Sequence, residues 1–217
     1  MKKVLLLIAA TYTLSGVSMA HTSPLHPTKV ISVLDFGAKP NDGKDDTKAL
    51  RKAAQYCRDN QGTTLEMPAG IYQLRDTKAE KLEKDVLSGK MGPNPEETIF
   101  TPYYPYVSGL DFSGSKDITI HANGAILLCE GWMEPISLID CINFTLEGLT
   151  IDYKRKPFSE GRVTEIADDS FTVQFGSEHK ITNEIPIPRL MLWDNQIGGI
   201  YRSPFYFPKR ELKGNNL

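Results

Sequence analysis

Apolar residues are most regularly placed between positions 33 and 74, where they predict a strand, an amphipathic helix and two more strands. The first predicted strand is Val33–Phe36. The helix is indicated by the apolar pairs 49–50 and 53–54, because this spacing places them on one helical face. Asp46 and Thr47 precede this face, where the N-cap of a helix belongs. The segment is therefore expected to begin extended and to continue into a helix with one core-facing side.

Two short strands are expected after the helix. Thr64–Met67 has a strand-like composition and is followed by Pro68, and Ile71–Leu74 is opened by Gly70. The loop before the helix, residues 40–43, consists of the turn formers Pro, Asn, Asp and Gly. This order of elements could begin many folds. The identities of the residues are therefore more informative about the fold than the hydrophobic pattern.

The amino-acid sequence of this segment resembles the opening segment of secreted right-handed parallel β-helix enzymes. Polygalacturonases, pectate-lyase-like proteins and related bacterial glycosidases begin with DFGAxxDGxxDDTxAL, followed by a helix and then VxxPxGxY. Here the chain reads DFGAKPNDGKDDTKAL from Asp35, and Met67–Tyr72 stands in the second place. The resemblance implies a mostly β protein, a right-handed single-stranded parallel β-helix with an N-terminal capping helix.

A weak internal repeat fits stacked coils. Asp117–Ile120 and Asn143–Leu146 each place a polar residue before an apolar–Thr–apolar strand, 26 positions apart. Residues 75–107 are charged and then aromatic, and we interpret them as an insertion. Residues 161–176 alternate polar and apolar side chains around the turn 167–169, which predicts a β-hairpin that decorates the coils.

Residues 109–163 indicate a more specific resemblance within the β-helix enzymes. Exo-acting α-1,3-galactosidases of glycoside hydrolase family 110, and β-helix relatives of gut Bacteroidetes, carry a similar series of strands and turns. The matching positions here are Asn123-Gly124, Met133–Pro135, Asn143–Leu146, Ile151-Asp152 and Arg155–Pro157. Lys156 departs from the usual Arg-Pro pair. Over Val33 to Phe175, the resemblance implies a cofactor-free hydrolase of galactose-containing glycans whose catalytic aspartates lie in later coils.

The first twenty residues predict a cleavable signal peptide. Lys2 and Lys3 form a basic start, residues 4–17 are mostly apolar, and Ser18–Ala20 offers small residues for cleavage near Ala20. The apolar run is too short to span a bilayer comfortably. We therefore expect residues 21–217 to form the amino-terminal part of one β-helix domain, periplasmic or extracellular, without a membrane span after cleavage.

Charge and cysteine content exclude some classes of partner. The net charge is −2, so the chain lacks the excess of basic residues that is typical of proteins that bind nucleic acid. Cys57, Cys129 and Cys141 lack CxxC spacing, so no metal site is predicted and the three are expected to pack as small apolar residues. A disulfide between Cys129 and Cys141 is left open as the alternative.

Few residues are candidates for catalysis or for substrate binding. The polygalacturonase signatures are absent, and the acidic pairs 45–46 and 168–169 suit a loop and a turn, so no catalytic residue is nominated. Asp152 is predicted to bind substrate, because it ends a strand and precedes the cations Lys154 and Arg155. Trp132 is the second predicted substrate-binding residue, by stacking on a sugar ring, with packing between coils as its alternative use.

The function expected from these observations is an exported glycoside hydrolase, galactosidase-like or polygalacturonase-like, that acts on an oligosaccharide or polysaccharide. The chain is expected to stop before its catalytic coils, since a β-helix glycosidase needs more coils than this length supplies. One alternative is a non-catalytic carbohydrate-binding or structural β-helix protein. Another is a pectate-lyase-type polysaccharide lyase, whose calcium-binding acid cluster is not evident. No cofactor or metal is expected.

Overall fold

The computed structural model describes residues 29–179, 181–187, 190–194, 196–200 and 211–213. The predicted signal peptide, residues 1–20, lies outside the described residues and stays a prediction. Among the helices of the described ranges, none combines the length and the apolar character that crossing a membrane requires.

The described chain is mostly β. Its strands are β1 (Lys29–Ser32), β2 (Thr63–Glu66), β3 (Gly70–Arg75), β4 (Ser108–Asp111), β5 (Lys116–Glu130), β6 (Glu134–Ser137), β7 (Ile142–Tyr153), β8 (Gly161–Ile166), β9 (Phe171–Phe175), β10 (Trp193–Asp194) and β11 (Gly199–Ile200). Its helices are α1 (Thr47–Asp59), α2 (Thr77–Leu87), α3 (Glu96–Ile99) and the single 3-10 turn η1 (Val33–Phe36).

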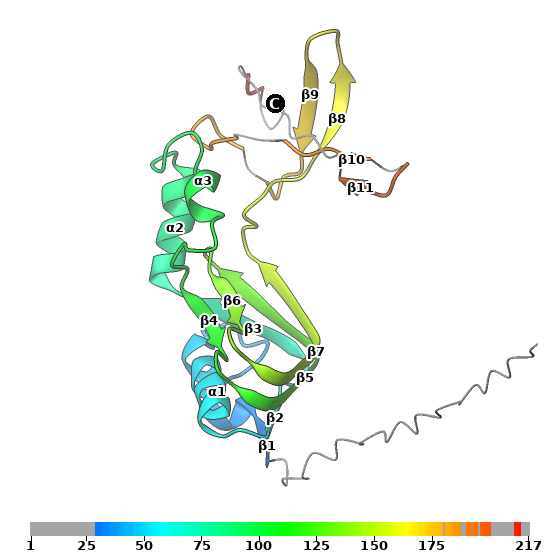
Figure 1. Cartoon of the computed structure of the whole chain (residues 1–217). Helices are drawn as coiled ribbons and strands as arrows, with labels where there is room; N and C mark the ends of the chain where they lie inside the picture. The colour runs from blue at the N-terminus through cyan, green and yellow to red at the C-terminus, as the bar shows by residue number, and fades with distance from the viewer. Residues whose placement is uncertain (1–28, 180, 188–189, 195, 201–210, 214–217) are drawn as a thin grey trace, which may run out of the picture.

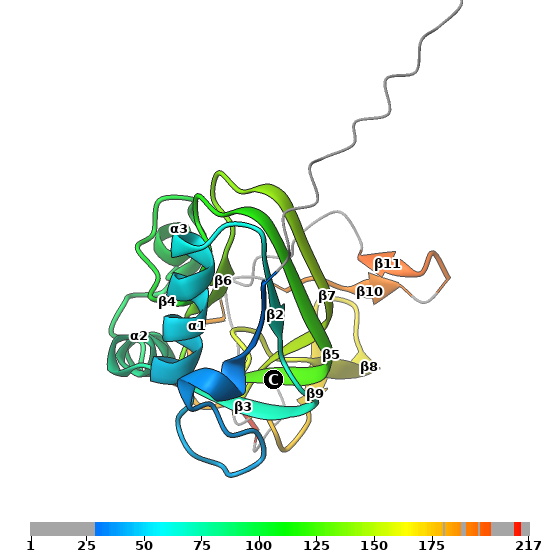
Figure 2. The same ribbon diagram turned by 90° about the horizontal axis from the view of Figure 1, so that it is seen from below.

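The central strands pair in parallel. β1, β2, β5 and β7 are neighbours in that order, and β3 pairs with the second half of β5. A separate parallel pair, β4 with β6, faces them across the core. Figure 1 shows the strands stacked above one another, and Figure 2 shows α1 and the β4–β6 pair on one side of the core and β2, β5 and β7 on the other. The mostly β, parallel architecture is confirmed.

Val33–Phe36 is a 3-10 turn, so the strand predicted there is wrong; the strand lies just before it, at β1. The Ser32 hydroxyl accepts a hydrogen bond from the Leu34 N–H at 3.2 Å, and the Asp35 carboxylate accepts one from the Ser32 N–H at 2.8 Å. This reciprocal capping box turns the chain at Ser32 despite the apolar composition that follows. Gly37 ends the turn with a φ of 98°.

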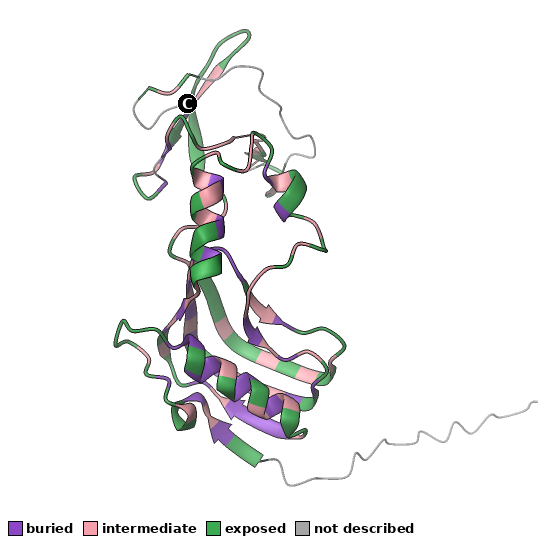
Figure 3. Cartoon of the chain, turned by 90° about the vertical axis from the view of Figure 1, so that its left-hand side faces the viewer, coloured by how far each residue is buried: buried purple, intermediate pink, exposed green. Residues whose placement is uncertain are grey.

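The predicted amphipathic helix is α1, and its buried face is the apolar one (Figure 3): Ala49, Leu50, Ala53, Ala54 and Cys57. Asp46 stands at the N-cap, but its side chain makes no capping bond. Its carboxylate instead accepts the N–H groups of Lys39, at 2.8 Å, and Gln73, at 3.1 Å, which ties the preceding loop to β3. Asp45 accepts the Thr47 N–H at 2.9 Å.

Two segments singled out from the sequence form regular structure. The charged part of residues 75–107 forms α2, whose Leu82 and Val86 pack with Ile99 and Trp132. The hairpin consists of β8 and β9, which pair antiparallel and project from the far end of the strand stack in Figure 1.

β5 and β7 both bend at a glycine corner. In β5 the corner lies at Asn123 and Gly124, where φ of the glycine is +81°, and in β7 it lies at Gly148, where φ is +74°. A Cβ atom on Gly148 would lie 2.1 Å from the Asn123 Oδ1 atom and 2.7 Å from its Cα. The two corners therefore stack so closely that only glycine fits in the second one.

Candidate functional site

The outer face of the β2–β5–β7 sheet carries polar side chains in rows across the strands. Alternate residues of β5, such as Ile118 and Ile120, are buried, so the residues between them point outward. The register aligns three threonines, Thr64, Thr119 and Thr145, in one row, in which Thr64 is buried and Thr145 is exposed. Side chains from chain positions far apart thus lie side by side.

The next row contains two acids and a histidine. Glu66 on β2 is opposite His121 on β5, which is opposite Glu147 on β7. The His121 Nδ1 atom and a Glu147 carboxylate oxygen are hydrogen-bonded. Two strand spacings separate the backbones of Glu66 and Glu147, about 9.5 Å. This row offers hydrogen-bonding groups to sugar hydroxyls, and it was not singled out from the sequence.

A sequence signal for part of this row does exist. The 26-residue repeat that aligns Asp117 with Asn143 also aligns His121 with Glu147. The Asn143 side-chain amide donates to the Asp117 carboxylate at 2.8 Å, which stacks the two repeats directly. Extending the repeat by one residue, past Ile120 and Leu146, would therefore have predicted the His121–Glu147 pair.

Asp152 lies beyond the glycine corner of β7, opposite Leu128 in the half of β5 that pairs with β3. It is exposed, and its Oδ1 atom accepts the N–H of Tyr153 at 2.8 Å. Of the cations expected beside it, Lys154 instead lies 3.5 Å from the Glu130 carboxylate. No ion pair engages Asp152 in the part of the chain that the structure describes, so its carboxylate remains open to a ligand, and its substrate-binding role stays a prediction.

Arg155, the second expected neighbour of Asp152, ties together the segment that follows β7. Its guanidinium donates to the Phe158 carbonyl at 3.2 Å and to the Ser159 hydroxyl at 3.0 Å, and lies 3.2 Å from Nδ1 of the buried His179. Burial lowers the pKa of Arg155, and the nearby Glu83 carboxylate opposes this change. Burial in turn raises the pKa of Glu83. This cluster positions backbone rather than ligand.

Trp132, the second residue predicted to bind substrate, is buried. Its side chain is 6% exposed and packs with Leu82, Val86 and Ile99 of the α2–α3 segment. The indole Nε1–H donates to the Arg155 carbonyl at 2.9 Å. The structure thus gives Trp132 the packing surroundings that were its alternative use, and sugar stacking by this ring stays a prediction. The two predicted substrate-binding residues therefore differ in exposure: Asp152 is exposed and Trp132 is buried.

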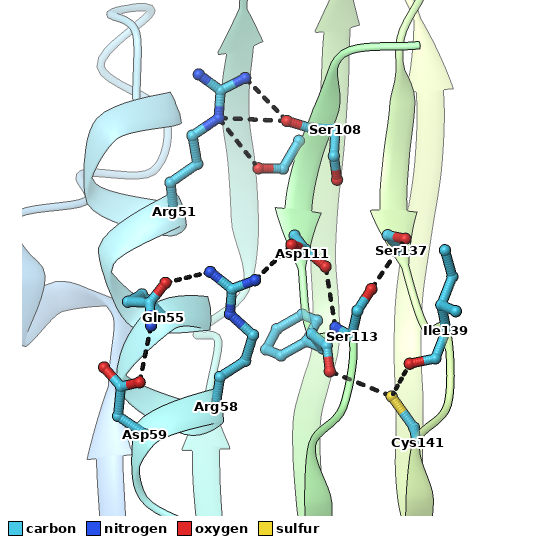
Figure 4. Close-up of polar contacts among 12 residues, drawn as sticks. Arg51, Gln55, Arg58, Asp59, Ser108, Asp111, Ser113, Ser137, Ile139 and Cys141 are labelled. Atoms are coloured by element: carbon cyan, nitrogen blue, oxygen red, sulfur yellow. Dashed lines mark hydrogen bonds and ion pairs between the residues drawn. The ribbon is translucent and has the colours of Figure 1, made fainter. Parts of the chain in front are cut away.

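All three cysteines are free thiols, so the disulfide between Cys129 and Cys141 is not formed. Cys57 and Cys129 are buried, and burial raises the pKa of each thiol to about 12. The Cys141 thiol donates to the Phe112 carbonyl at 3.2 Å (Figure 4). Within the described ranges no group of three or more His, Cys, Asp or Glu side chains could hold a metal ion.

Comparison with known proteins gives relatives of one activity. The chain is 29% identical over 150 residues to α-1,3-galactosidase B of Bacteroides thetaiotaomicron, covering 69% of this chain and 23% of that enzyme. It is 26% identical over 186 residues to α-1,3-galactosidase A of Shewanella woodyi, covering 84% and 28% respectively. The chain is similar to α-1,3-galactosidases.

A third relative, α-1,3-galactosidase B of Akkermansia muciniphila, is 27% identical over 143 residues, covering 66% of this chain and 16% of that enzyme. The chain thus spans between 16% and 28% of the length of these three relatives. No protein-family model matches the chain.

Proposed function

We propose that this chain is the amino-terminal part of an exported right-handed parallel β-helix glycoside hydrolase that acts on galactose-containing glycans. The similarity to α-1,3-galactosidases, which extends over as much as 84% of the chain, is the observation that carries this proposal. The role assigned to the described residues is to begin the β-helix and to support later coils that hold the catalytic carboxylates.

The strand registers support the coiled winding. β4 and β6 are joined by pairs such as Ser108 with Glu134, and β5 and β7 by pairs such as Lys116 with Ile142, both 26 residues apart. Beyond the corner, Ala125 pairs with Leu149, 24 residues apart. Three strand segments therefore repeat at nearly the same period, as expected when each turn of the chain lies on the one before.

The two ends of the stack differ in a way that supports further coils. At the start, α1 covers β4, and Asn41 of the preceding loop bonds both N–H and C=O of Ile71 on β3 at 2.9 Å. At the other end, β7 has a partner strand on one side, β5, among the described residues. A strand edge of this length usually pairs with another strand or is protected.

Side-chain burial supports the same conclusion. Core-facing residues of β5 are buried while their register partners on β7 are half-buried: Ile118 with Phe144, Ile120 with Leu146, and Ala125 with Leu149. Ile142 and Ile151 on β7 are exposed, at 52% and 45%. An additional coil over β7 would remove these apolar groups from water.

A non-catalytic carbohydrate-binding β-helix is the second candidate. It is favoured by the engagement of the acids on the outer face, since Glu147 bonds His121 and Glu130 bonds both Arg75 and Lys154. Carboxylates held in such pairs are suited to fixed hydrogen bonding more than to exchanging a proton with a substrate.

The experiment is to purify the native protein with an antibody against residues 29–179, measure its intact mass, and assay it on an α-1,3-galactosyl oligosaccharide. The proposal expects a mass well above the 24.2 kDa of this chain and release of free galactose. Glycan binding without galactose release would overturn the hydrolase in favour of the binding protein. Calcium-dependent formation of unsaturated products would indicate a polysaccharide lyase.

A further inference from the structure

A basic hollow lies along α1 and extends to Arg75 at the end of β3. Its volume is about 400 Å³, and it is lined by Asp45, Thr47, Lys48, Arg51, Lys52, Gln55 and Arg75. Four of these seven residues are cations and one is an acid. The whole chain has a net charge of −2, so the positive charge is concentrated at this place.

The two arginines of the hollow are held by protein groups. Arg51 donates to the Ser108 carbonyl at 2.8 Å and pairs with Asp76 at 3.0 Å. Arg75 pairs with Glu130 at 2.8 Å and donates to the Gly43 carbonyl at 3.2 Å. These contacts fix the guanidinium groups before any ligand arrives, which reduces the entropy lost on binding.

The two lysines supply the charge that protein acids do not balance. Lys48 and Lys52 are exposed, lie one helical turn apart on α1, and form no salt bridge with a carboxylate among the described residues. Asp45, the acid of the lining, already accepts the N–H of Thr47. The Thr47 N–H of the first turn is thus occupied, and the attraction for an anion comes from the side chains.

We propose that this hollow binds an anionic saccharide, a sugar that bears a sulfate or carboxylate group, with Lys48 and Lys52 contacting the charged substituent. The volume lies at the lower end of the range for small-molecule sites, which suits one or two sugar rings. That the ligand is a saccharide rests on the proposed function; that it is anionic rests on Lys48 and Lys52, the two cations of the lining without a salt bridge among the described residues. The site is an accessory one that selects charged glycans and takes no part in bond cleavage.

The test compares two double variants of equal charge change. Lys48→Ala with Lys52→Ala removes both free ammonium groups from the hollow, and alanine retains the helix because of its high helical propensity. Lys84→Ala with Lys116→Ala is the matched control, since both lysines are exposed and lie on α2 and β5. Circular dichroism and thermal unfolding establish that both variants are folded.

Binding is measured by isothermal titration calorimetry with a sulfated galactan tetrasaccharide, its desulfated form, and sodium sulfate at matched ionic strength. The proposal expects the sulfated sugar to bind the unaltered chain, and the Lys48/Lys52 variant to bind it about tenfold more weakly, equivalent to about 1.4 kcal/mol. The control should bind as the unaltered chain does, and salt should weaken the interaction.

Equal binding of the desulfated sugar, or equal losses in the two variants, would overturn the anionic site. Sodium sulfate binding as tightly as the sulfated sugar would overturn the saccharide assignment and leave a simple anion site. The binding assay does not depend on turnover. If the chain binds the sulfated sugar while the native protein releases no galactose, the anionic site is supported and the proposed hydrolase activity is contradicted.

Discussion

The Nη2 atom of Arg51 donates a hydrogen bond to the backbone carbonyl of Ser108 across 2.8 Å, and so joins α1 to the first residue of β4 (Figure 4). The Nε atom of the same side chain lies 3.4 Å from the Gly109 carbonyl. Seven residues along the helix, Arg58 contacts the Asp111 carboxylate at the other end of β4. Arg51 thus occupies backbone carbonyls of β4 to which a neighbouring strand could bond, which protects this edge from non-native pairing.

Replacing Arg51 with alanine should therefore destabilise the fold by about 1–2 kcal/mol, the lower part of the range for charged hydrogen bonds, because its side chain is 40% exposed. Chemical denaturation of the variant measures this loss. Arg51→Lys should restore only part of it, since one ammonium cannot reach both Ser108 and Asp76 with the arginine geometry. Lys52→Ala, on the same helix, should change stability by less than about 0.5 kcal/mol; an equal effect of both alanine variants would refute the edge-capping role.

The glycine corner of β7 makes a second prediction. Gly148→Ala places a Cβ at 2.1 Å from the Asn123 Oδ1 and 2.7 Å from its Cα, so the backbone of β5 would have to move. Gly114→Ala is the matched control, because Gly114 has a φ of +77° and a Cβ there would meet nothing within 4 Å. Thermal unfolding should show a loss of about 1–2 kcal/mol in the control, from the left-handed backbone alone. The Gly148 variant should lose about 1–3 kcal/mol more, and similar losses in both would contradict the close stacking.

Trp132 is expected to stabilise the contact between the α2–α3 segment and the strands. Trp132→Ala should cost about 3–5 kcal/mol because it removes a buried aromatic ring. Trp132→Phe should cost about 1 kcal/mol, since it keeps a ring but leaves the Arg155 carbonyl without its donor. Urea unfolding followed by circular dichroism measures both. Trp193 is 63% exposed, so Trp193→Phe serves as the control with little expected effect; a destabilisation equal to that of Trp132→Phe would contradict this account.

Stability should fall in acid through Asp76 and Asp111. Burial on its own would raise the pKa of each carboxyl, but the opposing hydrogen bonds and the arginines Arg51 and Arg58 outweigh it and hold both pKa values below 3.8. A carboxyl with a lowered pKa in the folded state stabilises the fold above the pKa of the unfolded chain, and this contribution is lost as pH falls through the folded-state value.

Urea midpoints measured between about pH 6 and pH 3 should therefore decrease for the unaltered chain, and decrease less for a variant that carries Asp76→Asn with Asp111→Asn. Asp168→Asn, at an exposed position in the turn of the β8–β9 hairpin, is the control and should retain the full pH dependence. The same slope in all three proteins would exclude the pairs of Asp76 with Arg51 and of Asp111 with Arg58 as its source.

Asp152 provides a test of glycan binding by β7. Asp152→Asn keeps the size of the side chain and removes the charge that accepts sugar hydroxyls, so affinity for a neutral galactose-containing oligosaccharide should fall about tenfold. Stability should stay within about 0.5 kcal/mol, because the side chain is exposed. Asp168→Asn again supplies the control. Unchanged affinity in the Asp152 variant would contradict the substrate-binding role of this residue.

The sequence predicted the elements whose determinants are local. Helix α1 follows from its apolar pairs, and the repeat at Asp117 and Asn143 correctly aligned β5 with β7. The strand predicted at Val33–Phe36 was wrong because two short polar side chains, Ser32 and Asp35, cap a turn that apolar composition does not reveal. Local capping can override composition in so short a segment.

The candidate site was harder to predict because it depends on contacts across the chain. Glu66 pairs with His121 only after the whole of β3, α2 and α3 has intervened, so no short-range repeat relates them. The surroundings of Trp132 are set by α2 in the same way. Lys154 was expected beside Asp152, yet a long flexible side chain can choose among several acids, and here it lies near Glu130.

The edge of β4 that α1 protects has a consequence for folding during translation. In the stack, β1, β2, β5 and β7 stand in the order in which the ribosome delivers them, and α1 is complete before β4 emerges. Each of β2, β5 and β7 therefore finds its earlier neighbour already synthesised, whereas β3 and β4 must wait for β5 and β6. Since amino-terminal units generally fold first during translation, the main stack can grow strand by strand as the chain is made, and Arg51 of α1 can cover the edge of β4 while that strand still lacks its partner.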